Sequence, residues 1–239
     1  MSVEPQIHIV LVETSHPGNI GAVARAMKNM SLASLRLVQP RYFPHSEAFA
    51  RASGAADVLD NAQVFDSLEA ALHDCSLVMG TSARPRNLAW PMLDPEQCAQ
   101  QAMVEAQQGG VALVFGRERT GLTNDELEHC HYRVHIPCNK DYSSLNIAAA
   151  VQVICYEVFK ARMQGNVSSD EPVSIPVPAQ RMEQYYVHLE QVLVELEFLN
   201  PQQPRHLMRR LRRLYQRARP DETEYNILRG ILTAMQKKI

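Results

Sequence analysis

The sequence of 239 residues lacks the features that mark several large classes of protein. It has no run of about 18 apolar residues, so we expect no membrane-spanning helix and no membrane partner. Its N-terminus, MSVEPQIHIVLVETSH, has neither the basic start nor the small-residue cleavage site of a signal peptide. The cysteines are few, odd in number and never arranged as CxxC, which predicts reduced thiols in a cytoplasmic protein. They are Cys75, Cys98, Cys130, Cys138 and Cys155.

A strongly positive net charge, expected of many nucleic-acid-binding proteins, is also missing, because the formal net charge is −2. The two parts of the chain nevertheless differ in sign. Residues 205–239 contain eight Arg and two Lys against three acidic residues, so they carry +7 while the remaining 204 residues carry −9. This asymmetry predicts a basic C-terminal module that binds an anionic partner.

The apolar residues, 46% of the chain, suffice for a full core, and their pattern indicates an α/β fold. Short apolar runs of strand type alternate with helical patterns, which predicts a mostly parallel sheet covered by helices on both faces. The expected strands are 7–12, 35–38, 64–65, 77–80, 111–115 and 132–136, and the expected helices are 20–30, 46–53, 67–73, 95–108, 124–129 and 145–163.

The chain is expected to contain an α/β domain at residues 1–163, a linker at 164–180 and a small all-helical extension at 181–239. The linker region has three prolines, three serines and no helical or strand periodicity. Helical spacing of apolar residues returns after it. The sequence Asp221-x-x-Glu224 resembles a capping box and predicts the start of the last helix.

One helix of the extension is unusually basic, with seven arginines and no acidic residue in 205–219. Its apolar stripe is expected at Leu207, Leu211, Leu214 and Ala218, with arginines on the remaining surface. Such a helix binds RNA phosphates, an anionic membrane or an acidic protein, or it is simply a solvated face. The stripe has no Trp or Phe for membrane insertion, which favours RNA. The candidate RNA-binding residues are Arg209, Arg210, Arg212 and Arg213.

Three loops contain residue types that bind ligands, and each follows an expected strand, where α/β folds place their sites. The first loop, HPGNIGAVAR, has glycines that permit close backbone approach and an arginine, Arg25, expected about a turn and a half into the next helix. A tight turn with a surface arginine explains this loop equally well. A dinucleotide site is less favoured, because the spacing is Gly-x-x-Gly and not GxGxxG.

The second loop, FGRERTGLTN, has a glycine on each side of Arg117, Glu118 and Arg119, which favours a ligand rim over simple surface ion pairs. The third loop, IPCNKDYSSLN, precedes a long apolar helix. Capping of that helix by Ser143 or Ser144 is one interpretation of this loop. It does not explain Asn146, expected just inside the helix, because Asn is a mediocre helix former.

A zinc site is a competing interpretation of the segment HCHYRVHIPC at residues 129–138, which has three His and two Cys. The segment is partly an expected strand, so alternate side chains point to opposite faces of the sheet. No second ligand pair has zinc-finger spacing. The sequence therefore predicts no metal.

Together these segments resemble the TrmH-type RNA 2′-O-ribose methyltransferases of the SPOUT superfamily. The first loop contains the family's Asn-x-Gly-x-x-x-Arg motif on Asn19, Gly21 and Arg25. The segments LVFGRERTGLTNDEL and IPCNKDYSSLNIAAAVQV resemble the second and third motifs, in the family's order. The resemblance implies a deep trefoil knot in the C-terminal part of the α/β domain, a rare exception to unknotted topology, and a homodimer.

The resemblance also implies a cofactor, a substrate and residue roles. S-adenosylmethionine is expected in the loops of the knot, and the implied reaction is 2′-O-methylation of cytidine or uridine at position 32 of the tRNA anticodon loop. Arg25 is expected to orient the ribose or phosphate and to stabilise a developing alkoxide, because a guanidinium normally stays protonated. Asn19, Glu118, Ser143 and Asn146 are expected to act as orienting residues. The implied cofactor-binding residues are Thr81, Ser82, Ala83, Gly116, Ile136, Ser143, Ser144 and Leu145.

Two other functions are compatible with parts of the sequence. A nucleotide-dependent α/β enzyme would bind phosphate at the Gly-x-x-Gly loop, but no Walker lysine follows that loop. An RNA-binding scaffold without activity would bind tRNA and not S-adenosylmethionine. The intact first and third motifs argue against such a scaffold.

Overall fold

The structure, a computed structural model, describes residues 6–82, 91–164, 176–203 and 205–238. The chain divides into two compact units, Met1–Ser168 and Ser169–Ile239. The first unit is an α/β domain and the second is all-helical, as the sequence predicts. Among the described helices, none has the length and apolar character needed to cross a membrane.

The first unit is built on a seven-stranded sheet in which every recorded strand pair is parallel. The sheet order is β3-β2-β1-β6-β4-β7-β5, with β1 and β6 wholly buried at its centre. This arrangement confirms the α/β prediction. The strands are β1 Ile7–Val12, β2 Ser34–Val38, β3 Gln63–Phe65, β4 Cys75–Thr81, β5 Met92–Leu93, β6 Gly110–Phe115 and β7 Tyr132–Val134.

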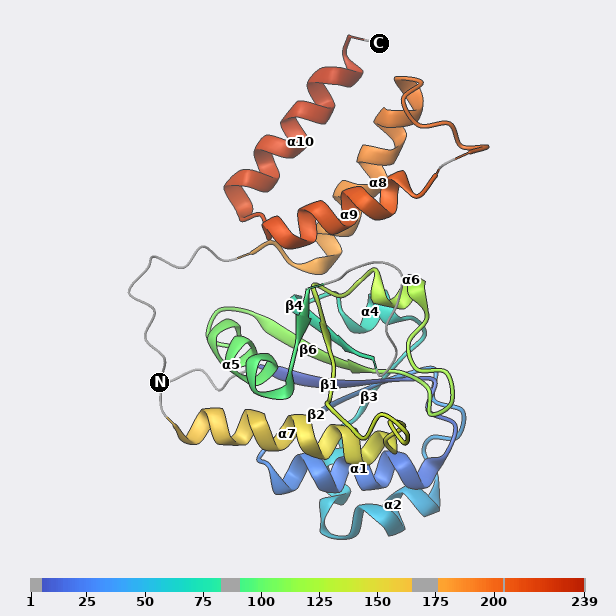
Figure 1. Cartoon of the computed structure of the whole chain (residues 1–239), viewed down its shortest axis with the longest axis vertical. Helices are drawn as coiled ribbons and strands as arrows, with labels where there is room; N and C mark the ends of the chain where they lie inside the picture. Colours follow the sequence, from blue (N-terminus) through green and yellow to red (C-terminus); the bar gives the residue numbers. More distant parts are fainter. Residues whose placement is uncertain (1–5, 83–90, 165–175, 204, 239) are drawn as a thin grey trace. The chain divides into compact units, whose positions relative to one another are not determined.

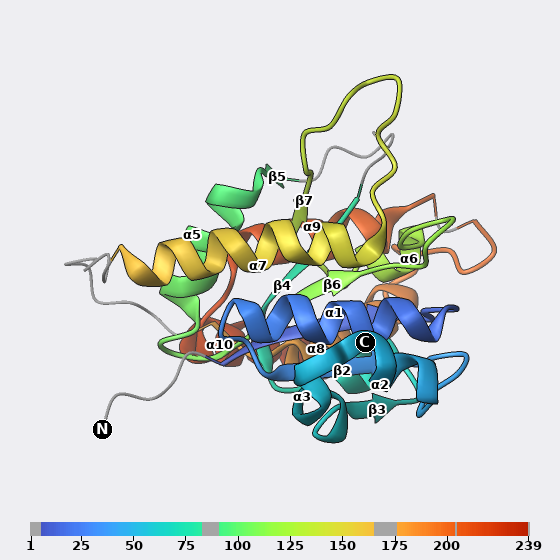
Figure 2. The same ribbon diagram turned by 90° about the horizontal axis from the view of Figure 1, so that it is seen from below.

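Helices cover both faces of this sheet, as Figures 1 and 2 show. One core cluster joins α1, α2, α3, α5 and α7 to the sheet, and a second, smaller cluster joins α4 and α6 to the opposite face. Parallel sheets need this double cover because both faces of their strands are apolar. The helices are α1 Pro17–Asn29, α2 Ser46–Ala52, the 3-10 turn η1 Ser53–Ala55, α3 Ala56–Asp60, α4 Leu68–Ala71, α5 Pro95–Glu105, α6 Asn124–Leu127 and α7 Ile147–Met163.

The start of α1 differs from the expected one. The helix begins at Pro17, three residues earlier, because proline suits the first helical position and the His16 side chain accepts a hydrogen bond from the Gly18 amide. Arg25 therefore lies roughly two turns into α1 and not a turn and a half. Gly21 lets α1 approach α2 closely, since a Cβ there would come within 2.0 Å of the Ala48 carbonyl oxygen.

The start of α7 also corrects the sequence expectation. The helix begins at Ile147, and its cap is Asn146, whose Oδ1 accepts a hydrogen bond from the Ala148 amide at 2.8 Å. The capping role expected for Ser143 or Ser144 is therefore wrong. Asn146 stands outside the helix, which removes the conflict with its low helix propensity.

A buried polar cluster lies in the sheet of the first unit. Arg36 on β2 is 3% exposed and donates to both carboxylate oxygens of Asp74, at 2.6 and 2.7 Å. Its Nη2 also donates to Nε2 of His8 at 3.2 Å, and the other ring nitrogen of His8 lies 2.7 Å from the Ser34 hydroxyl. These contacts satisfy a cation and an imidazole that would otherwise be costly to bury.

The second unit consists of three helices around a tyrosine-rich core. Its helices are α8 Ala179–Glu195, α9 Leu207–Ala218 and α10 Glu222–Gln236. Tyr185 packs edge-on against Tyr215 with ring centroids 5.0 Å apart. The capping box predicted from Asp221 and Glu224 is present at the start of α10. Part of the expected linker packs here, because Val177 is buried in this core, whereas residues 165–175 of the linker lie outside the described residues.

The apolar stripe expected on α9 is wrong in part. Met208, Leu211 and Tyr215 face the core, while Leu214 is 47% exposed and Ala218 is also exposed. Both stripes have helical spacing and share Leu211, so periodicity alone does not separate them. The aromatic partner Tyr185 decides the orientation, because Tyr215 offers more area to bury than leucine.

Candidate active site

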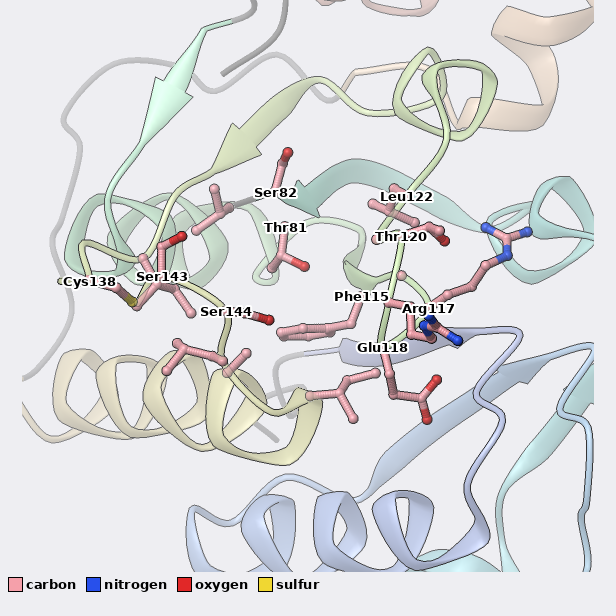
Figure 3. Close-up of a pocket in the computed structure, with 18 residues that line it drawn as sticks. Thr81, Ser82, Phe115, Arg117, Glu118, Thr120, Leu122, Cys138, Ser143 and Ser144 are labelled. Atoms are coloured by element: carbon pink, nitrogen blue, oxygen red, sulfur yellow. The ribbon is translucent and has the colours of Figure 1, made fainter. Parts of the chain in front are cut away.

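A pocket of about 250 Å³ lies where β4, β6 and β7 end, at Thr81, Phe115 and Val134. The loop after β6 and the start of α7 complete its wall (Figure 3). This position agrees with the general rule that α/β sheets bind ligands at the carboxyl ends of their strands. Seven residues of the implied cofactor set line the pocket, namely Thr81, Ser82, Gly116, Ile136, Ser143, Ser144 and Leu145; the eighth, Ala83, lies outside the described residues.

The loop after β6 folds tightly enough to require glycine. A Cβ on Gly116 would lie 2.2 Å from backbone atoms of Gly121 and Leu122. Gly121 itself has a φ of +69°, a conformation that residues with a side chain rarely adopt, and its amide donates to the Arg117 carbonyl at 2.9 Å. The predicted role of the two glycines in shaping a ligand rim therefore has a steric basis.

Glu118 connects this loop to the first motif. Its carboxylate accepts hydrogen bonds from the Ser15 amide and hydroxyl and from the His16 amide, at 3.1–3.3 Å. Its Oε1 also accepts from Nδ2 of Asn19 at 3.0 Å. Five contacts from one short segment hold the second loop against the start of α1.

Asn19 continues the connection to the third motif. Its Oδ1 accepts a hydrogen bond from Nδ2 of Asn146 at 3.1 Å, and Asn146 in turn caps α7. One chain of hydrogen bonds thus links Glu118, Asn19 and Asn146. In sequence, Asn19 is 99 residues from Glu118 and 127 residues from Asn146. We call this chain the three-motif network.

The network also sets the charge state of Glu118. Burial alone would raise the pKa of its carboxyl group. The hydrogen bonds from Asn19 and from the backbone of Glu118, Ser15 and His16 outweigh burial and hold the pKa below its ordinary value. Glu118 is therefore an anion that accepts hydrogen bonds at neutral pH, which suits an orienting role and not that of a proton donor.

Arg117, beside Glu118, is committed to ion pairs. Its guanidinium donates to Glu13, at the end of β1, and to Glu126 of α6 at 2.9 Å. These two carboxylates raise the pKa of Arg117 further above its ordinary value. Glu13 is a residue that sequence reasoning missed, although it directly precedes the first loop. The surface ion pairs considered for this loop are therefore partly right, since Arg117 makes them while Glu118 does not.

Arg25 is exposed on α1 and does not line the pocket. Within the described residues, no hydrogen bond or ion pair of its guanidinium is recorded. It shares its helix with Asn19, so the three-motif network fixes the start of the helix that carries it. Three of the predicted catalytic residues form the network, namely Asn19, Glu118 and Asn146. Two of them, Glu118 and Ser143, line the pocket. Arg25 belongs neither to the network nor to the pocket lining.

The arginines of α9 in the second unit fall into three groups. The Arg212 side chain is fixed by α8. It donates to both carboxylate oxygens of Glu183 at 2.5 Å, and its guanidinium lies 4.5 Å from the ring centre of Tyr186. Arg209 and Arg213 are half-buried. Arg210 and Arg217 are exposed on either side of Leu214 and form the outward surface of the helix. Arg217 was not among the predicted RNA-binding residues, and only the orientation of α9 reveals it.

The His and Cys residues considered for zinc are engaged in separate contacts. Cys130 is buried in the smaller core cluster, and His129 lies 3.0 Å from a carboxylate oxygen of Glu69. Nδ1 of His131 accepts a hydrogen bond from the Val78 amide. The one metal-like cluster among the described residues is His8, Asp74 and Cys75, and the Arg36 guanidinium occupies its centre.

Comparisons with known proteins agree with this geometry. Residues 6–156 match the SpoU rRNA methylase family, and residues 180–239 match the C-terminal domain of the tRNA methyltransferase TrmJ. The chain is 54% identical to the tRNA (cytidine/uridine/adenosine-2′-O-)-methyltransferase TrmJ of Pseudomonas aeruginosa, over 97% of this chain and 94% of the relative. It is also 54% identical to the tRNA (cytidine/uridine-2′-O-)-methyltransferase TrmJ of Pectobacterium atrosepticum, over 97% of each chain.

A solved structure extends the likeness to the fold. The crystal structure of TrmJ from Z. mobilis ZM4 superposes with a TM-score of 0.85 at 36% identity, covering 98% of this chain and all of that one. These matches confirm the resemblance to SPOUT methyltransferases drawn from the three motifs, while the trefoil knot itself stays a prediction. The chain belongs to the SpoU methylase family of RNA methyltransferases, in its TrmJ branch.

Proposed function

We propose that this protein transfers a methyl group from S-adenosylmethionine to the ribose 2′-hydroxyl of cytidine or uridine at position 32 of the tRNA anticodon loop. One observation carries the proposal. The pocket gathers seven residues of the implied cofactor set at one edge of the sheet, and the three-motif network joins that edge to the helix of Arg25. The names of the relatives, which specify 2′-O-methylation of tRNA, support the same reaction.

The chemistry of the pocket fits S-adenosylmethionine. Its walls are largely apolar, with Phe115, Leu122 and Ile147 beside the implied Ile136 and Leu145, and such walls suit an adenine ring. Thr81, Ser82, Ser143 and Ser144 add hydroxyls that can hydrogen-bond the ribose or methionine part. When bound, the cofactor supplies a methyl group already activated on a sulfonium, so the reaction needs no metal.

The protein's own residues then have to align the ribose and manage the charge on its oxygen. We assign to Arg25 the role of donor to the ribose or phosphate, and of stabilising negative charge on the 2′-oxygen. Glu118, Asn19 and Asn146 hold the three motifs together, and Ser143 lies on the pocket wall. Alignment of this kind supplies several kcal/mol of a methyl-transfer barrier, on the order of 7 or more in well-oriented systems.

The second unit is assigned to tRNA binding. Arg210 and Arg217 present two exposed cations on one surface of α9, next to an exposed Leu214. Exposed arginines suit phosphate contacts, which dominate the affinity of proteins for nucleic acids. Arg209 and Arg213 remain secondary candidates, and Arg212 serves chiefly to hold α9 against α8.

We also propose that the protein works as a cytoplasmic homodimer. An apolar stripe of Ala149, Tyr156 and Met163 is exposed along α7 at seven-residue spacing, and Tyr142, near the pocket, is 79% exposed. Large exposed apolar groups in a row are typical of a surface that a partner covers. The molar mass measured by light scattering during gel filtration should equal about twice 27.0 kDa.

The reaction is tested by incubating the protein with unmodified tRNA and methyl-labelled S-adenosylmethionine, then mapping the labelled nucleotide. Three transcripts that differ only in having C, U or A at position 32 separate the specificities in the two relatives' names. We expect 2′-O-label on C and U transcripts. Label elsewhere in the tRNA would keep the reaction class and overturn the position. In a parallel incubation with ribosomal RNA, label on that RNA and none on tRNA would overturn the substrate.

A further inference from the structure

One residue of the pocket wall, Ser82, is held by Arg133 and Val134 of the neighbouring strand β7 and by His135, the residue directly after it. Its amide donates to the Val134 carbonyl at 3.0 Å, and its carbonyl accepts from Nδ1 of His135 at 3.3 Å. Its hydroxyl accepts from Nη2 of Arg133 at 3.0 Å. Each polar group of Ser82 thus has a partner on β7 or on the residue directly after it.

The residue before Ser82 is held from the other side. The Thr81 hydroxyl donates to the Val114 carbonyl of β6 at 3.1 Å, and β4 lies between β6 and β7 in the sheet. Figure 3 shows the side chains of Thr81 and Ser82 pointing in different directions at the end of β4. The end of β4 is therefore fixed by both neighbouring strands at the point where it forms the pocket wall.

Arg133 is the residue of this arrangement whose burial costs the most free energy. It is only 5% exposed, and burying a guanidinium carries a desolvation penalty that an apolar residue would avoid. It does not line the pocket, whereas the adjacent Val134 does. Arg133 lies outside the pocket and donates to a hydroxyl on the pocket wall. This arrangement favours a role in orienting that hydroxyl over a role in stability alone.

We propose that Arg133, assisted by His135, is a positioning residue for the cofactor pocket. Arg133 holds the Ser82 hydroxyl and His135 holds the Ser82 carbonyl, and together they set the wall against which S-adenosylmethionine binds. The inference rests on the proposed function, because it assumes that this cofactor occupies the pocket. Arg133 acts through Ser82 and touches neither the cofactor nor the tRNA.

The test is a double-mutant cycle on cofactor affinity, measured by calorimetric titration of the full chain with S-adenosylmethionine. Arg133→Gln and Ser82→Ala should each raise the dissociation constant about tenfold, the range of one hydrogen bond to a charged group. The double variant should bind no more than about twofold more weakly than either single variant, because both changes remove the same contact. Arg133→Lys, which keeps a cationic donor, should recover most of the affinity.

Arg36→Gln is the matched control, because Arg36 is equally buried in the same sheet but lies in the His8 and Asp74 cluster. It should lower the melting temperature and leave the cofactor dissociation constant within about twofold. Unchanged affinity in Ser82→Ala, a small change that keeps the main-chain contacts, would overturn the inference, and so would additive effects in the cycle. Failure of the unaltered protein to bind S-adenosylmethionine would instead overturn the proposed function.

Discussion

The two units of this chain use arginine in opposite ways. In the first unit, Arg36 and Arg133 are buried, and Arg117 is shared by two carboxylates at the edge of the pocket. In the second unit, Arg210 and Arg217 stand exposed on one surface of α9. Paired arginines fix the geometry of neighbouring groups, whereas exposed ones are available to an external anion. The buried and paired arginines of the first unit therefore serve its shape, and the exposed arginines of α9 are available to a partner.

This difference explains why the net charge of −2 is a poor guide to RNA binding. Some acidic residues of the first unit form ion pairs within that unit, as Glu13 and Glu126 do with Arg117. The surplus of basic residues lies in the last 35 residues of the chain. If the two units have separate roles, the substitutions that lower turnover should differ from those that weaken tRNA binding.

The largest expected effect belongs to Arg25, an exposed cation of the first unit. Arg25→Ala should lower kcat by at least about a hundredfold, the size seen when one donor to a developing oxyanion is removed. The dissociation constant for S-adenosylmethionine should stay within about threefold, because Arg25 does not line the pocket. The dissociation constant for tRNA should change far less than kcat, because Arg25 is assigned one contact at the reacting nucleotide. Single-turnover methylation and separate binding titrations measure the two properties.

Lys28→Ala is the matched control for Arg25, since Lys28 is another exposed cation of α1 but pairs with Asp57 at 2.7 Å. This variant should keep nearly normal turnover. Normal turnover in Arg25→Ala would remove Arg25 from the reaction. Loss of tRNA affinity in the same variant would show that the first unit also binds RNA with exposed charge, which would break the contrast between the units.

The sequence predicts the architecture of the first unit well because the central strands of its sheet are buried on both faces. Runs such as IHIVLV and VALVF have little alternative to a central parallel strand. The short edge strand β5 was not predicted, since two residues carry no periodicity. The helix starts at Pro17 and Ile147 were also missed, because they depend on capping by His16 and Asn146.

The candidate site was predictable as a set of residues, and its connections were not. The motifs supply Asn19, Glu118 and Asn146, but no local pattern indicates that their side chains bond one another across such distances in sequence. Arg133 gave no signal at all, because a basic residue in a short strand is usually exposed. In the second unit, the choice between Leu214 and Tyr215 as the inward residue depends on Tyr185, a tertiary contact.

A smaller effect is expected from the exposed cations of the second unit. Replacing Arg210 and Arg217 together with Gln should weaken tRNA binding roughly tenfold at moderate salt. The slope of log affinity against log salt should become less steep by about 2, one unit for each lost phosphate contact. The kcat at saturating tRNA should be nearly unchanged, because neither residue belongs to the unit that contains the pocket. Filter binding over a salt series measures both quantities.

Arg212→Gln sharpens this prediction, since it removes an arginine of the same helix that is committed to Glu183 and Tyr186. It should lower the melting temperature of the second unit and leave the salt slope close to that of the unaltered protein. An equal loss of slope in both variants would mean that α9 attracts tRNA through its total charge and not through its exposed surface.

The last expected effect concerns stability and vanishes at neutral pH, and it tests the buried cluster around Arg36 in the first unit. Burial, followed by the nearby charge of Arg36, lowers the pKa of His8 from 6.5 to about 4. His8 is therefore neutral in the folded protein where the unfolded chain already binds a proton. Its contribution to stability is complete above pH 6.5 and is lost as the pH falls from 6.5 to about 4, by no more than about 3 kcal/mol.

His8→Gln should flatten this part of the stability curve, measured by urea unfolding of the first unit at half-unit steps of pH. The pairing of Asp74 with Arg36 has a separate window, because the pKa of Asp74 is held below its ordinary 3.8 and its contribution is lost only at lower pH. The two groups can thus be distinguished in one titration. An identical stability curve between pH 6.5 and 4 with and without His8 would contradict this prediction. It would mean that the His8 imidazole can be protonated beside Arg36 without a loss of stability, so that the buried cluster does not keep it neutral.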